Sequence, residues 1–369
     1  MTETPNGPDG HDRPEIAAWN RLVDALRDAG TRLAADTAEL SRIEQADGFR
    51  ALLRAVTNQL ARFEVDRDRP ELVAFNQWRQ KFMMDNPDFQ YWVADVRADG
   101  RYRIRGNRAD AHYVSITAYA TAGGDAQATS RIDSDTLHFD EFGNYDVVVG
   151  GEPVPGSDWL GLPERASAIW VRHFHERVHT DEIGWCRIDP VGTPPVPQPI
   201  APERFAAQLT KLATMASLVP QIWSTARAAD EQNLNRLRHW DEMSGGAVFT
   251  EPGIHYLRGG WRLAPDEALV IEGELTPCRY WNILAYSRFL NSLDHRYRPV
   301  SYTGATATLT GNRYRFVVSG TAPAAAAGDW IDTENRPFGV LVMRFLQPER
   351  PPELPTVRRI ALADLDGQS

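Results

Sequence analysis

The chain has 369 residues, which exceeds the ~100 to 200 residues of a typical domain and favours two domains or one duplicated unit. Apolar residues make up 42% and the formal net charge is −10, from 40 Lys and Arg against 50 Asp and Glu. Since no basic run is interleaved with aromatics, a nucleic-acid-binding surface is excluded. No stretch reaches the ~18 consecutive apolar residues that a membrane span requires.

The beginning of the chain and its cysteines indicate a compartment. The opening residues, MTETPNGPDGHDRPE, lack a basic region followed by an apolar core. Cys186 and Cys278 are the only cysteines, so the sequence provides neither a disulfide framework nor a thiolate zinc site. We therefore expect an unexported protein in the reducing cytoplasm.

Apolar residues at helical spacing predict packing helices near the N-terminus. One group comprises Ile16, Trp19, Leu22, Val23 and Leu26, and the next comprises Phe49, Leu52, Leu53, Val56, Leu60 and Phe63. A third amphipathic helix is predicted from Leu72, Phe75, Trp78 and Phe82. It should end at Asn86-Pro87, because the residue before a proline disfavours helix.

The middle of the chain changes from strand to helix. RYRIRG, HYVSITAY, YDVVVG and AIWVRHFH are short, β-branched or aromatic segments typical of antiparallel strands. Residues 190–202, PVGTPPVPQPIAP, carry six prolines in thirteen positions and predict an extended connector. A helical block follows from Glu203 to about Met243, in which Pro220 is expected to introduce a kink or a break.

The β pattern returns after Gly246 and resembles the first β region. IRGNRADAHYVSITAY, from Ile104 to Tyr119, aligns without gaps on IEGELTPCRYWNILAY, from Ile271 to Tyr286. Later matches occur in the same order: Val148-Val149 with Val317-Val318, Asp158-Trp159 with Asp329-Trp330, and Arg172 with Arg344. We infer two copies of one β-unit.

The duplication predicts a mainly β fold with helical segments. We expect two tandem β-sandwich or jelly-roll-like domains, N-terminal helices and a central helical connector. The predicted boundaries are 1–87 for the N-terminal helical region, 88–190 for the first β-sandwich, 191–245 for the proline linker and helices, and 246–369 for the second β-sandwich.

Residues that only one copy carries are the first candidates for chemistry, because shared residues are expected to serve the fold. After Trp330 the second copy has Asp332, Thr333 and Glu334, where the first has Gly161, Leu162 and Pro163. Asp332 is interpreted either as a catalytic carboxylate near a cavity opening or as an Asx-turn residue that binds its own backbone. The first copy has His173 and His175 where the second has Phe345 and Gln347.

The two histidines suggest a metal site as one alternative. His173 and His175 should project from the same face of a strand, ~6.6 Å apart. A third ligand would have to come from His179, Asp181, Glu182 or His255. The other interpretation is a pair of hydrogen-bonded histidines at a buried strand end, and we predict no metal and no organic cofactor.

Common catalytic motifs are missing: the sequence has no GxSxG, P-loop, GxGxxG after a strand, or HExxH. Candidate acid and base residues are therefore Asp332, His295, Asp294, His173 and His175. Tyr286, Arg344 and Trp330 are candidate substrate-binding residues, although as shared residues they are expected first to serve the fold.

Two classes of function remain. The first is a cofactor-independent acid–base enzyme, a dehydratase, isomerase or hydrolase, that acts on a small lipophilic metabolite in a cavity between the β-units; the 11 tryptophans would suit an aromatic lining. The second is a non-catalytic small-molecule-binding or assembly protein. No nucleic acid or membrane partner is expected, and a homo-oligomer is left open.

The second β region also resembles a known bacterial family. RYWNILAYSRFLNSLDHRYRPVS followed by GDWIDTENRPFGVLVMRFLQPE is similar to the C-terminal signature of the family called domain of unknown function twelve-fourteen, from about Gly259 to Leu365. The segment DWLGLPERASAIWVRHFHE resembles, more loosely, its frequent companion, domain of unknown function twelve fifty-four. The resemblance implies two sandwich or jelly-roll-like domains with inserted helices, and it implies no activity.

Overall fold

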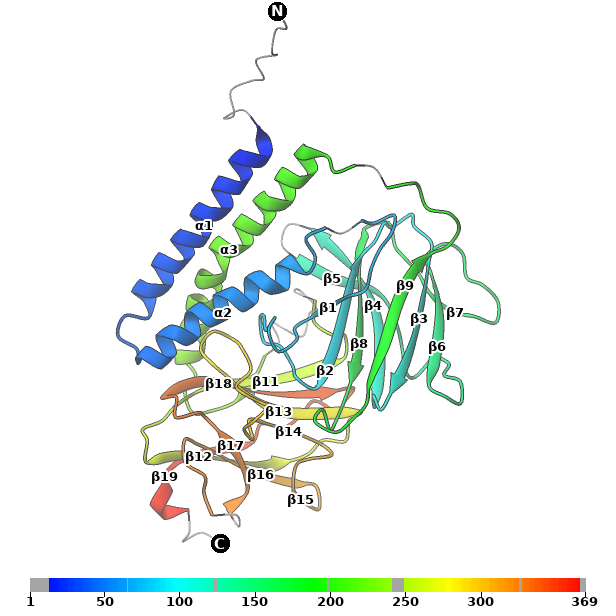
Figure 1. Cartoon of the computed structure of the whole chain (residues 1–369). Helices are drawn as coiled ribbons and strands as arrows, with labels where there is room; N and C mark the ends of the chain where they lie inside the picture. The colour runs from blue at the N-terminus through cyan, green and yellow to red at the C-terminus, as the bar shows by residue number, and fades with distance from the viewer. Residues whose placement is uncertain are drawn as a thin grey trace, which may run out of the picture. The chain divides into compact units, whose positions relative to one another are not determined.

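The computed structural model describes residues 13–64, 66–122, 125–197, 199–240, 249–324 and 327–365. The chain divides into two compact units. The helical unit comprises residues 1–64 and 195–227, and the β unit comprises residues 65–194 and 228–369. Figure 1 labels the helices and strands and colours them along the chain. The predicted class, mainly β with N-terminal helices and a central helix, is confirmed.

The helical unit contains α1 (Pro14–Asp36), α2 (Arg42–Leu60) and most of α3 (Pro202–Glu231). Proline occupies the start of α1, where its missing N–H has no intrahelical partner to lose. At the start of α2, Ser41 accepts a hydrogen bond from the Glu44 amide and donates to its carboxylate. Small and apolar residues of α1 and α3 form a shared core that includes Ala18, Leu22, Ala25, Leu209 and Leu212.

Two helix predictions need correction. α3 continues through Pro220 without a break and ends at Glu231, earlier than the sequence suggested. Residues 72–82 form no helix; they contain β1 (Val73–Phe75) and turns, with Asn76 in the left-handed region of backbone conformation. The second copy binds the backbone of the following segment: the Met84 amide donates to the Leu290 carbonyl, and Tyr286 donates to the Asp85 carbonyl. Met83 and Met84 have positive φ angles, which a helix does not allow. These tertiary contacts outweigh the local helical pattern.

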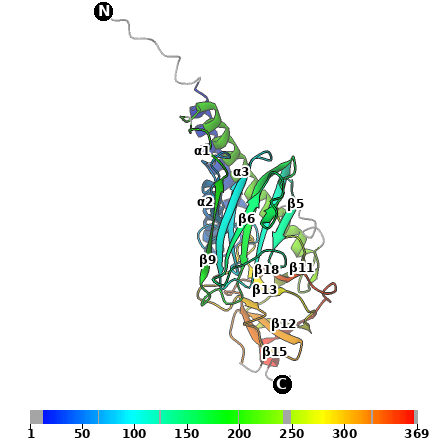
Figure 2. The ribbon, with the colours of Figure 1, turned by 90° about the vertical axis from the view of Figure 1, so that its right-hand side faces the viewer.

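The first β-sandwich is built from two sheets and an apolar core. Its strands are β1, β2 (Phe89–Asp95), β3 (Tyr102–Ala109), β4 (Tyr113–Ala122), β5 (Asp125–Asp133), β6 (Asn144–Val149), β7 (Asp158–Leu160), β8 (Ala166–Phe174) and β9 (Ile183–Pro190). The five-stranded sheet has the order β1-β2-β8-β4-β5, and the four-stranded sheet has the order β7-β6-β3-β9. Figure 2, turned by 90° from Figure 1, labels β6 and β9 of the four-stranded sheet. The sandwich begins with β1, before the boundary predicted at residue 87.

The second β-sandwich repeats this design. Its strands are β10 (Arg238–His239), β11 (Ile254–Arg262), β12 (Glu267–Glu274), β13 (Tyr280–Tyr286), β14 (Ser301–Thr303), β15 (Leu309–Thr310), β16 (Arg313–Ser319), β17 (Asp329–Asp332), β18 (Phe338–Leu346) and β19 (Thr356–Ala361), before a short 3-10 helix, Leu362–Asp364. Its five-stranded sheet has the order β10-β11-β18-β13-β14, and β15-β16-β12-β19 form the other sheet.

The strand orders of the two sandwiches correspond, including one parallel pair in each, β6 with β7 and β16 with β17. Shared residues make the same contacts. Trp159 donates its indole N–H to the Gly150 carbonyl, and Trp330 donates to the Ser319 carbonyl. The matching strand order and contacts therefore support the inferred duplication.

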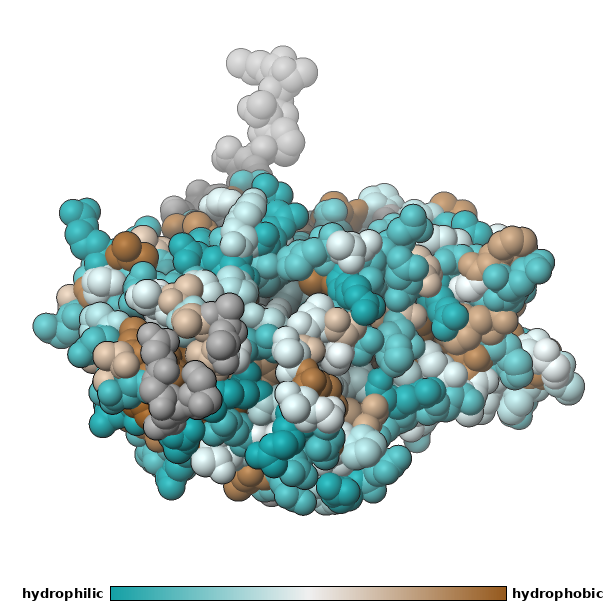
Figure 3. All heavy atoms as spheres, turned by 90° about the horizontal axis from the view of Figure 1, so that it is seen from below, coloured by the Kyte–Doolittle hydropathy of each residue, from teal (hydrophilic) through white to brown (hydrophobic). Residues whose placement is uncertain are grey.

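The surface is mostly polar on the face drawn in Figure 3, where hydrophobic residues form small, separate groups. Within the described ranges, no helix is long and apolar enough to cross a membrane.

Candidate functional site

The five-stranded sheets of the two sandwiches bury polar side chains on the faces turned away from their own cores. Arg172 on β8 and Arg344 on β18 occupy equivalent positions, and each lies opposite a tyrosine of the neighbouring strand, Tyr91 or Tyr256. Both arginines are almost completely buried. Arg172 donates to Glu251 at 2.7 Å, whereas Arg344 donates to the Tyr286 hydroxyl at 2.6 Å and has no ion-pair partner among the described residues.

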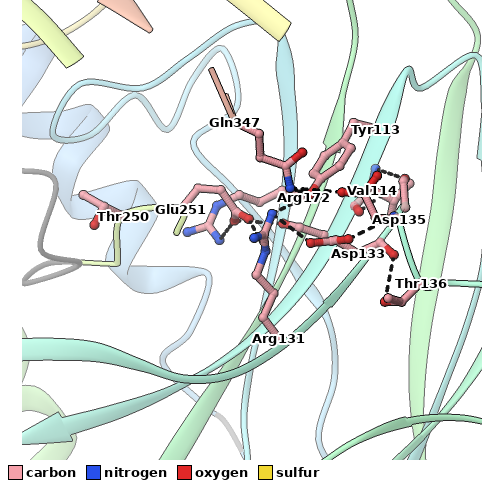
Figure 4. Close-up of polar contacts among 12 residues, drawn as sticks. Tyr113, Val114, Arg131, Asp133, Asp135, Thr136, Arg172, Thr250, Glu251 and Gln347 are labelled. Atoms are coloured by element: carbon pink, nitrogen blue, oxygen red, sulfur yellow. Dashed lines mark hydrogen bonds and ion pairs between the residues drawn. The ribbon is translucent and has the colours of Figure 1, made fainter. Parts of the chain in front are cut away.

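Glu251 is the centre of a charged network that joins the two copies (Figure 4). Its carboxylate accepts hydrogen bonds from Ser115 at 2.8 Å and Arg172 at 2.7 Å, and the Arg131 guanidinium lies 2.9 Å away. Burial raises the pKa of the Tyr119 hydroxyl to about 12, so this group stays protonated and donates to the Thr250 carbonyl. We interpret this network as structural, since separation of the copies would leave buried charges without their partners, which is costly.

The second polar feature is the buried carboxyl group of Asp88, which contacts the second copy. Its Oδ2 accepts hydrogen bonds from the Tyr280 hydroxyl at 2.7 Å and the Asn282 amide at 2.8 Å. Its backbone carbonyl accepts the His175 amide at 2.8 Å, which fixes the main chain. Burial raises the pKa of Asp88, and the hydrogen bonds from Asn282 and Tyr280 oppose this rise. Oδ1 accepts no hydrogen bond from the described residues.

Asp88 lines a pocket of about 540 Å³ between the two sandwiches. The first copy contributes Asp88 and residues 176–180, and the second contributes residues 295–299, 301–303 and 306. The imidazole rings of His179 and His295 stack in this pocket with centroids 6.1 Å apart. The volume lies within the range of small-molecule sites.

The lining carries more positive than negative side chains. It contains three arginines, Arg177, Arg296 and Arg298, and two acids, Asp88 and Glu176. Arg298 is already paired with Asp332 at 2.6 Å, while neither Arg177 nor Arg296 has an ion-pair partner among the described side chains. The pocket therefore suits a ligand with polar or anionic groups.

Of the five predicted acid–base residues, His295 alone lines the pocket. Asp294 precedes it, and the Asp294 amide donates to Glu334 at 2.6 Å. Asp332 is buried rather than at an opening: its carboxylate accepts the Glu334 amide at 2.7 Å and pairs with Arg298 instead of Arg344. These contacts match the Asx-turn interpretation.

His173 and His175 lie away from the pocket. His173 is hydrogen-bonded to the Tyr145 hydroxyl at 2.9 Å and packs against Trp92, and burial lowers its pKa to about 3. Burial also lowers the pKa of His175, although Asp181, 3.5 Å from its Nδ1, opposes the effect. Among the described residues, no group of three His, Cys, Asp or Glu side chains could hold a metal ion.

None of the predicted substrate-binding residues lines the pocket. The buried side chains of Tyr286 and Arg344 are hydrogen-bonded to each other. The Trp330 indole donates a hydrogen bond to the carbonyl of Ser319, the last residue of β16. Sequence reasoning missed Asp88 because it assigned the preceding residues to a helix. The Asn-Pro-Asp turn that ends the predicted helix was the available signal.

Comparisons with known proteins support the fold. The structure is similar to that of an uncharacterized protein from Burkholderia cenocepacia, with a TM-score of 0.86 and 24% identity over 94% of this chain and 97% of that one. It also resembles the VPA0106 protein from Vibrio parahaemolyticus, with a TM-score of 0.50 and 12% identity over 92% of this chain and all of that one. No family model and no curated protein matches the sequence. At these identities the structural likeness concerns the fold alone.

Proposed function

We propose that the chain is a cofactor-independent acid–base enzyme that acts on a small metabolite in the pocket between the β-sandwiches. The observation that carries the proposal is the Asp88 carboxyl group. It is buried, its pKa is raised, two donors hold one of its oxygens, and it lines a pocket that also contains two imidazoles. Perturbed carboxyl groups of this kind cluster at functional sites.

Asp88 and His179 supply the two groups that a dehydration, an isomerisation or a hydrolysis requires. In a dehydration, His179 takes a proton from carbon, the C–O bond breaks, and the oxygen leaves as water with the proton of Asp88. A proton then returns from His179 to Asp88 and restores the starting state. His179 and Asp88 line the same pocket, and a positive charge on His179 lowers the pKa of Asp88.

The arginines favour a substrate with a carboxylate or another anionic group. Arg177 and Arg296 offer guanidinium groups without ion-pair partners among the described side chains. A substrate of this kind differs from the purely lipophilic metabolite that composition suggested, because charged side chains are among those that line the pocket.

Two further assignments rest on the sequence. We propose that the chain belongs with the domain of unknown function twelve-fourteen family, on the segments that carry the resemblance. We also propose a cytoplasmic location, which the two unpaired cysteines, Cys186 and Cys278, would suit.

A non-catalytic binding protein is the second candidate. It is favoured by the separation of His173, His175 and Asp332 from the pocket, since an acid–base site built from the predicted residues would have gathered them. In that case the pocket holds a ligand without converting it.

A screen of purified protein against small hydroxy and keto carboxylic acids separates the two candidates. Thermal shift reports binding, and proton NMR of the mixture reports conversion. The enzyme proposal expects at least one compound to be converted, and Asp88→Asn to abolish conversion while the compound still binds.

Asp85→Asn is the matched control, because Asp85 is a buried carboxyl of the same segment that hydrogen-bonds Ser292 and does not line the pocket. It should retain conversion. Compounds that bind and are never converted would favour the binding protein.

A further inference from the structure

A second pocket lies on the outer face of the four-stranded sheet of the first sandwich, the sheet whose β6 and β9 appear in Figure 2. Its volume is about 1010 Å³, larger than that of the pocket beside Asp88. The residues that line it come from β3, β6, β7 and β9 and from the turns before β6 and β7. The proposed acid–base chemistry uses none of them.

Rows of paired polar side chains cross this face. Arg103 and Asp146 form two hydrogen bonds, at 2.6 and 2.5 Å, and Arg105 binds Asp189 at 2.6 Å. The charges of these four side chains are thus neutralised within the sheet, while each keeps further hydrogen-bonding capacity towards solvent. Asp140 and Asp158 also line the pocket. A surface of fixed, balanced donors and acceptors suits a neutral ligand with many hydroxyl groups rather than an anion.

An aromatic side chain stands at one end of the same face. Trp185 on β9 lies opposite Asn107 in the strand register, and 49% of its surface is exposed. The guanidinium group of Arg187 lies 5.8 Å from its ring centre. A half-exposed indole offers a flat apolar platform for the C–H face of a sugar ring, and nearby polar groups can bind the ring's hydroxyls.

The duplication provides an internal comparison. Arg105 corresponds to Glu272, which binds both Arg315 and Arg358, so the second copy keeps a charged row on the equivalent face. Arg187 and Thr356 occupy equivalent positions, so counting two residues back along the chain matches Trp185 with Leu354, which precedes β19. The aromatic platform therefore belongs to one copy and is not required by the fold.

We propose that this face of the first sandwich binds a neutral oligosaccharide. Trp185 stacks against one sugar ring, and the Arg103–Asp146 and Arg105–Asp189 pairs bind hydroxyl groups of the neighbouring rings. The size of the pocket suits a chain of sugars rather than a single ring.

Isothermal titration with cellohexaose, xylohexaose, mannohexaose and chitohexaose tests the proposal. At least one should bind the full-length protein, with loss of roughly tenfold or more in affinity for Trp185→Ala and a smaller loss for Trp185→Phe. Leu354→Ala, at the equivalent position of the second copy, should bind as the wild type does.

Circular dichroism verifies that each variant is folded. Trp185 is half-exposed, so its replacement should leave the fold intact. Failure of all four hexasaccharides to bind, or unchanged binding by Trp185→Ala, overturns the proposal. Binding of charged oligomers in preference to these neutral ones does so as well.

Discussion

The hydroxyl group of Tyr280 donates a 2.7 Å hydrogen bond to Oδ2 of Asp88, and this bond joins the two copies of the duplicated β-unit at a residue that lines the pocket. Tyr280 begins β13 in the second copy, while Asp88 directly precedes β2 in the first. The proton affinity of the proposed catalytic carboxyl therefore depends on a residue nearly two hundred positions further along the chain.

Removal of this donor should change the pH dependence of the site. The Tyr280 bond lowers the pKa of Asp88 against the rise that burial causes, so Tyr280→Phe should raise the pKa further. The limb of the activity profile that reports Asp88 should then move to higher pH. Tyr314→Phe is the control, because Tyr314 does not line the pocket, and a profile unchanged by Tyr280→Phe contradicts this role.

Loss of Glu251 should strongly destabilise the unit that the two β-sandwiches form. Glu251→Gln leaves the buried guanidinium of Arg172 without its carboxylate, which should lower the free energy of unfolding by about 3 to 5 kcal/mol. Glu274→Gln breaks an exposed pair with Arg313 and should cost less than about 1 kcal/mol. Denaturant unfolding measures both, and similar values for the two variants would refute a structural role for the network.

His173 should make stability depend on pH. Its folded-state pKa of about 3 lies below the ordinary value of 6.5, so between these values the unfolded chain binds a proton that the folded chain does not. The free energy of unfolding should therefore fall as the pH is lowered from about 6.5 towards about 3, by up to about 1.4 kcal/mol per pH unit from this group.

His173→Phe isolates this contribution, because the second copy carries Phe345 at the equivalent position. The variant should lose less stability than the wild type over the same range. Equal slopes for the two proteins in denaturant titrations would show that His173 titrates in the folded state as it does in the unfolded one.

Asp332 should prove to be a turn residue. Asp332→Asn keeps an acceptor for the Glu334 amide and loses the pair with Arg298, so we expect a cost of about 1 kcal/mol with pocket binding retained. Asp332→Ala also loses the backbone contact and should cost more. A stable Asn variant that binds ligand but converts nothing would instead restore the catalytic interpretation of Asp332.

Much of the architecture could be predicted because it depends on local patterns. Period-two strands, the proline connector and the gapless alignment of Ile104–Tyr119 with Ile271–Tyr286 correspond to observed elements. The duplication also indicated structural roles, and Trp159 and Trp330 do make matching hydrogen bonds.

The site was less accessible to sequence reasoning because it forms between copies. His179 and His295 meet only after β8 and β13 have brought two turns together. Asp88 was hidden for another reason: residues 72–82 have helical spacing, but the second copy binds the backbone of the segment that follows in a non-helical conformation. Apolar spacing reports local amphipathicity and contains no information about such long-range backbone contacts.

Turnover by the Asp88→Asn variant tests the central claim most directly, once a converted compound is known. Proton NMR of the mixture follows the substrate and its product. Asp88→Asn, which has no carboxyl proton to give to the leaving oxygen, should bind the compound with similar affinity and form no product, while Asp85→Asn converts it as the wild type does. Product formation by Asp88→Asn at the wild-type rate would contradict the assignment of Asp88 as the proton-transferring group.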